Sequence, residues 1–444
     1  PASHQSVRPR PERYRLPPPN WSGIRPPRST TGPEVGGGSA RLAGVGSGGL
    51  RRRLYALAFV DEFGPVYAVW TLWFNDHGVS TGEISTVFLV WALIALVLEI
   101  PSGALADRVD RRRLLAAAFL IRGVGISAWL VWPTFEGLLI GALLWAAHDA
   151  FASGTWEAMI HDELTAIGDE RHYANVMARI SQFSNLGVAS GTMLGAALLD
   201  ERIGIVVSLS TLGWLTVAAH VGSVSLVSTM PDVRWVTDTG EPMSYRAYLR
   251  TLRGGLAEAR RVPIIGKLIV LGAMLEGLFL FDEYVPLLAR ARGGADGAAA
   301  VIVLVVWIGL LAGGEVAARK PDVRGVTVGV GLLVGVAVTA TSLLTEPVWT
   351  LALLAVGYGI HEVAWIPTDA RLQERATPQV RATVTSVRGF GSATVSMAFF
   401  AIVAALSDGD DPTPGLLAAL GLLAIAGVLL IAWLPARSSA DASR

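Results

Sequence analysis

The sequence contains no cysteine and little charge. The missing thiols exclude disulfide bonds, thiolate catalysis and cysteine-ligated metals. Charged residues make up 16% of the chain, whereas a soluble domain contains about a quarter. The formal net charge is +0, so no overall field favours nucleic acid as a partner. Neither a Gly-x-Ser-x-Gly motif nor a P-loop is present, which argues against serine hydrolysis and against ATP as an energy source.

Apolar residues, in contrast, make up 52% of the chain. They fall in blocks of about 20 residues, the length that a helix needs to cross a hydrocarbon core of about 30 Å. Turn-forming residues separate the blocks. The blocks predict twelve transmembrane helices at roughly 54–75, 82–106, 112–132, 135–160, 174–199, 203–229, 263–289, 296–318, 323–344, 347–370, 380–406 and 413–434. We therefore expect an all-α polytopic membrane protein.

The polar segments divide this pattern into domains. Residues 1–53 are rich in Pro, Gly and Arg and predict a disordered tail. A six-helix bundle is expected over 54–229 and a second one over 263–436, with a tail at 437–444. The central segment 230–262 is polar and predicts a loop without folded structure. Proline and glycine at the turns agree with these boundaries.

Basic residues predict the orientation in the membrane. If the first tail is cytoplasmic and the helices alternate, five cytoplasmic loops and their helix edges hold 20 Lys and Arg. The six external loops then hold only Arg202, Arg290 and Arg292. Because cytoplasmic loops carry an excess of basic residues, both termini are predicted to be cytoplasmic. We expect a multi-pass protein of the plasma membrane.

The two predicted bundles share motifs in the same order. The first helix of each carries Asp-Glu-aromatic-x-Pro, and the fourth carries a histidine followed by an acid. These motifs are Asp61 to Pro65 and Asp282 to Pro286, together with His148-Asp149 and His361-Glu362. The shared order predicts a parallel repeat, as in six-plus-six transporters. A proline inside a helix removes a hydrogen bond, so we expect both first helices to be kinked.

Ionisable residues recur within the apolar blocks. Each costs about 2.5–3.5 kcal/mol near the membrane centre on insertion scales, so their repetition favours a function beyond holding helices together. Asp149, Ser153, Glu157 and His161 have the spacing of one helix face, which should line a cavity. We predict a cavity for substrate and protons lined by Asp61, Glu62, His148, Asp149, Ser153, Trp156, Glu157, Asp282, Glu283, Tyr358, His361, Glu362, Trp365 and Asp369. Arg122 should be a buried charge paired with Glu62 or Asp149.

The segment from Glu99 to Arg113 resembles the loop signature of the major facilitator superfamily (MFS). The residues that match the signature are Gly103, Asp107, Arg108, Arg111 and Arg112, and Asp110 stands where the family has glycine. The resemblance implies the MFS fold over about residues 53–436. It also implies that this loop gates one side, with Asp107 contacting the other half. Carboxylates near helix N-termini and arginines can form contacts that break and reform.

A second resemblance concerns the fifth predicted helix. Gly187, Gly191 and Gly195 keep the glycine spacing of a signature found in drug/proton antiporter-type exporters, and Thr192 replaces its proline. Close helix packing also explains such small residues. The signature therefore adds only modest support for export.

The sequence leaves several functions open. The acidic cavity favours proton-coupled efflux of a small, cationic or amphipathic molecule, because a desolvated carboxylate can hold a proton near neutral pH. A proton-coupled importer or facilitator of a nutrient would share the fold. A membrane enzyme is disfavoured, because Trp365 stands where the second histidine of a zinc motif belongs. A transporter-like sensor would need the tail or central loop as its output. We expect a monomer in the lipid bilayer, with no cofactor and no metal.

Overall fold

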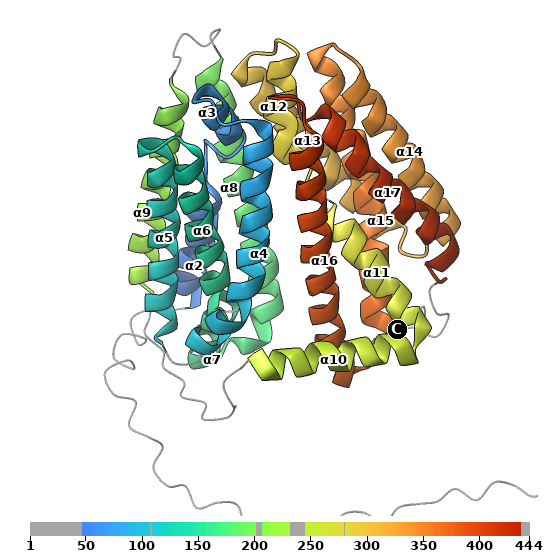
Figure 1. The fold of residues 1–444 in the computed structure, drawn as a ribbon. Coiled ribbons are helices and arrows are strands. Elements are labelled where there is room, and N and C mark those ends of the chain that lie inside the picture. Colours follow the sequence, from blue (N-terminus) through green and yellow to red (C-terminus); the bar gives the residue numbers. More distant parts are fainter. Residues whose placement is uncertain are drawn as a thin grey trace, which may run out of the picture.

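The computed structural model describes residues 47–106, 109–153, 155–200, 207–230, 245–278 and 280–436. All named elements in these ranges are helices, and they form two groups that stand side by side (Figure 1). Within these described ranges, ten segments are long and apolar enough to cross a membrane. The broken first span and the more polar fifth span complete the twelve predicted crossings. The prediction of an all-α membrane fold in two bundles is confirmed.

The helices follow the predicted blocks closely. The N-terminal bundle contains α2 (Ser47–Glu62), α3 (Trp70–Asp76), α4 (Thr81–Ala106), α5 (Arg111–Val131), α6 (Phe135–Ala152), α7 (Thr155–Ala166), η1 (Glu170–His172), α8 (Tyr173–Leu199) and α9 (Leu209–Ser228). Helix α10 (Tyr245–Arg261) connects it to α11 (Pro263–Gly277), η3 (Asp282–Tyr284), α12 (Val285–Ala291), α13 (Asp296–Arg319), α14 (Gly325–Leu344), η4 (Val348–Leu353), α15 (Leu354–Arg375), α16 (Pro378–Leu406) and α17 (Thr413–Trp433). Side-chain caps from Asp110, Thr134 and Ser208 fix three of the starts.

The first span of each bundle is broken, and the predicted simple kinks are wrong. Helix α2 ends at Glu62 and α3 begins only at Trp70. Gly64 lies in this gap, where a Cβ atom would come within 2.1 Å of the Tyr67 ring, so the tight turn requires glycine. The residue before a proline is also pushed out of the helical region, which ends α2 before Pro65. In the other half, η3 interrupts the span between α11 and α12.

The fourth span is also interrupted. Helix α6 ends at Ala152, and Ser153 has φ −58° and ψ 134°, which is not helical. The predicted polar stripe from Asp149 to His161 therefore does not lie on one continuous helix. The side chain of His161 is 61% exposed and points away from the interior.

Two boundaries differ from the predicted domains. Helix α2 begins at Ser47, so the end of the expected tail is helical, and Arg51 forms an ion pair with Asp169. The central segment is not without structure, because α10 occupies residues 245–261 of it. Arginines and leucines recur there at helical spacing, a signal that the low overall hydrophobicity conceals. The other residues of the first tail, and those of the second, lie outside the described ranges.

The two bundles contact each other at one end. We call the end where α2 begins and α10 lies the basic end, and the opposite one the closed end (Figure 1). At the closed end, Thr81 Oγ1 donates a hydrogen bond of 2.8 Å to the Asp410 carbonyl. Arg290 of α12 forms an ion pair with Asp76 of α3. Both contacts join the N-terminal bundle to the C-terminal one.

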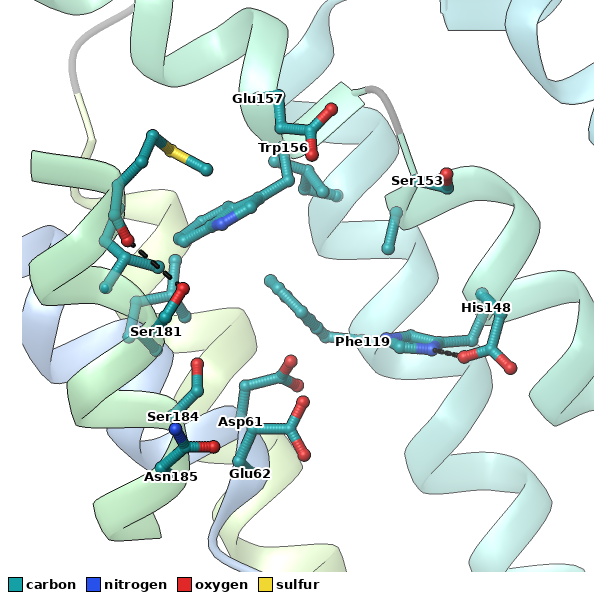
Figure 2. Close-up of a pocket in the computed structure, with 17 residues that line it drawn as sticks. Asp61, Glu62, Phe119, His148, Ser153, Trp156, Glu157, Ser181, Ser184 and Asn185 are labelled. Atoms are coloured by element: carbon teal, nitrogen blue, oxygen red, sulfur yellow. Dashed lines mark hydrogen bonds and ion pairs between the residues drawn. The ribbon is translucent and has the colours of Figure 1, made fainter. Parts of the chain in front are cut away.

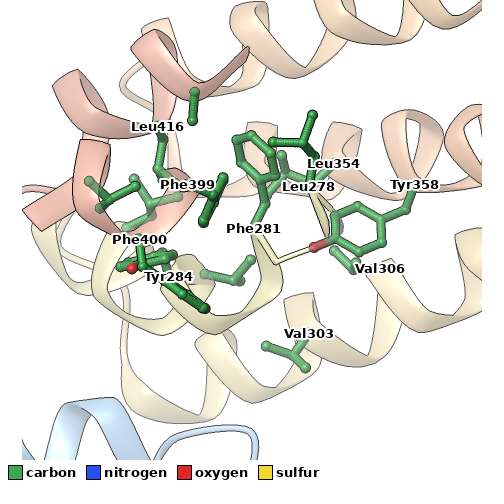
Figure 3. Packing of buried hydrophobic residues seen from close by; sticks show 14 of the residues in the cluster. Leu278, Phe281, Tyr284, Val303, Val306, Leu354, Tyr358, Phe399, Phe400 and Leu416 are labelled. Carbon is green, nitrogen blue, oxygen red and sulfur yellow. The ribbon is translucent and has the colours of Figure 1, made fainter. Parts of the chain in front are cut away.

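Aromatic packing strengthens this contact. The hydroxyls of Ser85 and Tyr284 are hydrogen-bonded across the two halves at 2.8 Å. Phe88 of α4 stacks on Phe400 of α16, with ring centroids 4.8 Å apart. Figure 3 shows Tyr284, Phe399 and Phe400 gathered in one apolar cluster beside the broken span. The closed end is sealed by side chains from both halves.

The glycines of the fifth span bring α8 close to the first span. A Cβ atom on Gly187, Gly191 or Gly195 would lie 2.3, 2.8 or 2.4 Å from a backbone atom of that span. Such distances are too short for any side chain larger than hydrogen. The glycine spacing therefore has a packing role in this structure, next to the break that carries Asp61 and Glu62.

Replacing Gly191→Val should lower the thermal unfolding temperature of the purified protein. Its new side chain would meet the backbone of Gly64, and overpacking of this kind costs about 1–3 kcal/mol. Gly421→Val is the matched control, because no atom lies within 4 Å of a Cβ at Gly421. Both positions are helical, so the change in helix propensity from glycine to valine is the same in the two variants. Equal losses in the two variants would contradict the packing role.

Candidate transport site

A cavity of about 470 Å³ lies in the N-terminal bundle, with walls from α2, α5, α6, α7 and α8 (Figure 2). Seven residues predicted from the sequence line it, namely Asp61, Glu62, His148, Asp149, Ser153, Trp156 and Glu157. Ser181, Ser184 and Asn185 of α8 complete its polar wall. The sequence did not single out these three, because uncharged polar residues in a helix carry a weaker signal than buried charges.

The cavity occupies the part of the bundle nearer the basic end. Helix α2 runs from that end and stops at Glu62, which places Asp61 and Glu62 at the deep end of the cavity. Trp156 and Glu157 belong to α7, which lies at the basic end (Figure 1). Both acids of the first Asp-Glu pair line the wall, although a continuous helix would separate them by about 100°.

A buried arginine stands behind this deep end. The Arg122 side chain is 6% exposed, and its Nη1 lies 3.9 Å from Asp61 Oδ1. Its guanidinium also lies over the ring of Trp145, 4.5 Å from the centroid. The expected acidic partner exists, but it is Asp61 rather than Glu62 or Asp149. The sequence could not decide between adjacent acids, since the choice depends on where α2 ends.

Two further side chains complete this cluster and were not predicted. His220 Nδ1 of α9 lies 3.6 Å from Asp61 Oδ1, and its Nε2 is hydrogen-bonded to the Tyr67 hydroxyl at 2.8 Å. The His220 side chain is 1% exposed. Asp61 is therefore held between a histidine and an arginine that the cavity wall hides. A lone histidine in an apolar helix is a signal that could have marked His220.

His148 and Asp149 interact with each other in the cavity wall. His148 Nδ1 lies 3.0 Å from Asp149 Oδ1. The histidine is buried against Phe119, whereas the Asp149 side chain is 36% exposed and faces the cavity. The carboxylate of Asp149 is thus available to a ligand, and His148 orients it.

The corresponding residues of the C-terminal bundle do not line this cavity. Tyr358 donates a hydrogen bond of 2.9 Å to Asp282 Oδ1 and accepts one of 2.6 Å from the Asp282 backbone N–H. His361 Nε2 donates to the Leu275 carbonyl at 2.8 Å. Tyr358 and His361 border a void of about 20 Å³, which has room for a single water. These contacts support the broken seventh span, and the predicted role of these residues in a transport cavity stays a prediction.

A separate charged cluster links three helices of the C-terminal bundle. Arg388 of α16 forms an ion pair with Glu276 of α11, and its Nε lies 3.6 Å from Asp369 Oδ1. Its guanidinium lies 4.9 Å from the ring centroid of Trp365. Trp365 and Asp369 were predicted as site residues, whereas Arg388 lies in the predicted helix 380–406 and was not singled out. Glu276, an acid inside an apolar block, was the signal that the sequence offered.

Other predicted residues lie apart from both clusters. Glu283 belongs to η3, beside Asp282, and is half-buried. Glu362 of α15 is also half-buried.

The structure describes three of the five residues expected to gate the basic end. Gly103 lies in α4, whereas Asp107 and Arg108 lie outside the described residues. Arg111 forms an ion pair with Asp162 of α7, and Arg112 Nη1 donates to the Met230 carbonyl at 3.1 Å. Both of these contacts stay within the N-terminal bundle. They anchor the start of α5 to its neighbours, and the gating role of the loop stays a prediction.

The wall of the cavity has a clear chemical preference. Asp61, Glu62, Asp149 and Glu157 supply four carboxylates, and Trp156 adds an aromatic face. Acids attract cations, and an indole ring favours a cation or an apolar group. In the described part of the chain, no three His, Asp or Glu side chains converge as a metal site requires. The wall is suited to an organic cation or to protons.

Two bundles of membrane helices around a solute-sized cavity define the fold of a multi-pass membrane protein with a transporter-like architecture. The sequence profile described as Major Facilitator Superfamily matches residues 54–401, which is most of the chain. The chain therefore belongs to the major facilitator superfamily.

Individual relatives are distant. The uncharacterized MFS-type transporter YxaM of Bacillus subtilis (strain 168) is 22% identical over 166 residues, 35% of this chain and 40% of that protein. The uncharacterized MFS-type transporter MT2531 of Mycobacterium tuberculosis is 29% identical over 147 residues, 32% of this chain and 34% of that protein. The chain thus spans less than half the length of these relatives. A crystal structure of a mutant of the nucleoside transporter NupG superimposes with a TM-score of 0.69, at 12% identity, over 87% of this chain and 100% of that one.

Proposed function

We propose that this chain is a secondary transporter that exports small cationic or amphipathic molecules across the plasma membrane in exchange for protons. The observation that carries this proposal is the cavity of about 470 Å³ with four carboxylates and an aromatic face. Its size suits a small organic molecule. Its charge favours a cation over an anion.

The proposed orientation of the bundle places the cavity on the side from which an exporter takes up its substrate. Basic residues gather at the end where α2 begins, so we assign the basic end and both termini to the cytoplasm. The cavity then faces inward, and the closed end faces outward. In the proposed cycle the contacts of Arg290, Ser85 and Tyr284 separate, while the loop of Asp107 and Arg108 closes the basic end. Residues 54–229 and 263–436 are the two bodies that move.

Coupling to protons rests on competition for the same carboxylates. A cation and a proton each neutralise a carboxylate of the cavity. The two therefore compete for the same carboxylate. Protons that enter from outside displace the cation, and the cation that binds from inside displaces protons. Asp61 is already neutralised in part by Arg122, so Glu62, Asp149 and Glu157 are the proposed exchange sites.

Glu62→Gln should lower the pH-gradient-driven transport of ethidium, a fluorescent organic cation, in proteoliposomes by about tenfold. Loss of one charge-assisted contact is worth about 1.5–3 kcal/mol, a factor of about 10–150 of which tenfold is the lower end. Glu315→Gln is the control, because Glu315 is 61% exposed and pairs with Arg319 on the surface of α13. Unchanged ethidium transport in Glu62→Gln would overturn the assignment of Glu62 as an exchange site.

Import of a nutrient is the alternative, because the nucleoside transporter NupG shares this fold. The same proteoliposomes distinguish the two directions. Export requires that an imposed proton gradient drives ethidium against the direction of proton flow. Movement of solute and protons in the same direction would favour the importer.

A further inference from the structure

Helix α10 differs from every membrane span in its orientation and its composition. It lies across the basic end, at a steep angle to α16 and α11 (Figure 1). Its sequence holds five arginines and a single acid, Glu258. One residue, Val262, separates its last residue, Arg261, from the candidate span Pro263–Ala291.

The depth of α10 is set by its contact with α16. Gly255 is buried, and a Cβ atom there would lie 2.5 Å from Val387 Cγ2 and 3.0 Å from the Thr383 carbonyl. Thr383 is the first residue of the candidate span Thr383–Leu406. Helix α10 is therefore held at the level where two candidate membrane spans begin. Lipid headgroups occupy this level in a bilayer.

The side of α10 that faces away from α16 carries both apolar and basic groups. Leu249 and Leu256 are 49% and 44% exposed, and they are two turns apart on one edge of the helix. Next to this edge, Arg250, Arg253, Arg260 and Arg261 are exposed. Leucines beside a row of arginines are typical of a helix that lies in the membrane interface. In water, exposure of these two leucine side chains would be unfavourable.

We propose that α10 is a binding surface for anionic lipid headgroups in the leaflet at the basic end. The leucines insert below the headgroups, and the arginines form ion pairs with phosphates above them. Arginine suits this role because its planar guanidinium binds two phosphate oxygens at once. Since Gly255 packs directly on α16, the lipid also fixes α10 against the helix that contacts α4 at the closed end.

The full-length protein in nanodiscs tests this proposal. Phosphatidylglycerol titrated into phosphatidylcholine nanodiscs should raise the unfolding temperature of the unaltered chain. Each arginine that reaches a headgroup contributes about fivefold to apparent lipid affinity. The variant Arg250→Gln/Arg253→Gln/Arg260→Gln/Arg261→Gln should need at least about tenfold more phosphatidylglycerol for half of the same shift.

The matched control removes four charges at the same end but away from α10. It combines Arg113→Gln, Arg171→Gln, Arg319→Gln and Lys320→Gln, which replace exposed residues. This control should keep the response of the unaltered chain. If both variants lose the response equally, net charge and not α10 attracts the lipid, and the proposal is wrong.

A second measurement does not depend on the stability of the arginine variant. The chain has no cysteine, so a spin label on Leu249→Cys or on Arg253→Cys reports one position. The label at position 249 should be more accessible to oxygen, which concentrates in lipid. The label at position 253 should be more accessible to a water-soluble nickel complex. Equal access of the nickel complex to both labels would place α10 in water and overturn the proposal.

Discussion

A disulfide bond between α4 and α16 at the closed end should abolish transport by the oxidised protein. The double variant Gly82→Cys/Ala404→Cys places the two thiols there, because a Cβ atom on Gly82 would lie 3.2 Å from the Ala404 carbonyl oxygen. The proposed cycle requires these helices to separate. Ethidium transport in proteoliposomes should fall about tenfold or more on oxidation, since a disulfide of typical geometry holds the Cα atoms within about 7 Å. Reduction should restore it.

The absence of native cysteine makes this experiment specific. Each single variant, oxidised in the same way, should keep its activity. A second pair, Gly297→Cys/Asp200→Cys, joins α13 to α8, because a Cβ atom on Gly297 would lie 3.4 Å from the Asp200 backbone nitrogen. Full transport with either disulfide formed would show that the closed end does not open during the cycle.

Asp61→Asn should cause the largest loss of stability among the single substitutions in the cavity wall. The change leaves the Arg122 guanidinium buried without its nearest carboxylate, which costs about 3–5 kcal/mol for a buried ion pair. His220, 3.6 Å from the same carboxylate, loses its partner too. A decrease in the unfolding temperature of the detergent-purified protein measures the effect.

The double variant Asp61→Asn/Arg122→Met separates structure from transport. Removing the orphaned charge should recover much of the unfolding temperature, whereas ethidium transport should stay low. Asp149→Asn is the control, because the Asp149 side chain is 36% exposed and interacts with His148 at the surface of the cavity. If the double variant is no more stable than Asp61→Asn alone, the two charges are not coupled in the folded protein.

The span pattern could be predicted because it depends on local composition. Each block of about 20 apolar residues must form a helix, since a lipid environment offers no other partner for backbone N–H and C=O groups. Most helices therefore begin and end within a few residues of the prediction. Helix α10 was missed because the prediction depended on average composition, and this segment is polar on average. Its signal is the spacing of arginine and leucine, and average polarity does not record spacing.

The breaks were harder to predict, because a proline inside an apolar block indicates only a disturbance. Whether the helix bends at Pro65 or ends at Glu62 depends on Gly64, Tyr67 and the glycines of α8 that pack against this turn. These residues are far apart in sequence. The interruption at Ser153 has no proline at all.

The sequence by itself determined the twelve spans, the two related halves and the acids of the N-terminal cavity, because hydrophobic length and buried charge are properties of short segments. Only the tertiary structure decided which charges meet. Arg122 pairs with Asp61 because α2 ends beside α5, and Tyr358 bonds to Asp282 because α15 packs against a broken span. The repeated motifs predicted one cavity lined by residues of both halves, and among the described residues the N-terminal set lines a cavity of about 470 Å³. Equivalent residues in the two halves therefore have different neighbours, since packing between distant helices sets their contacts.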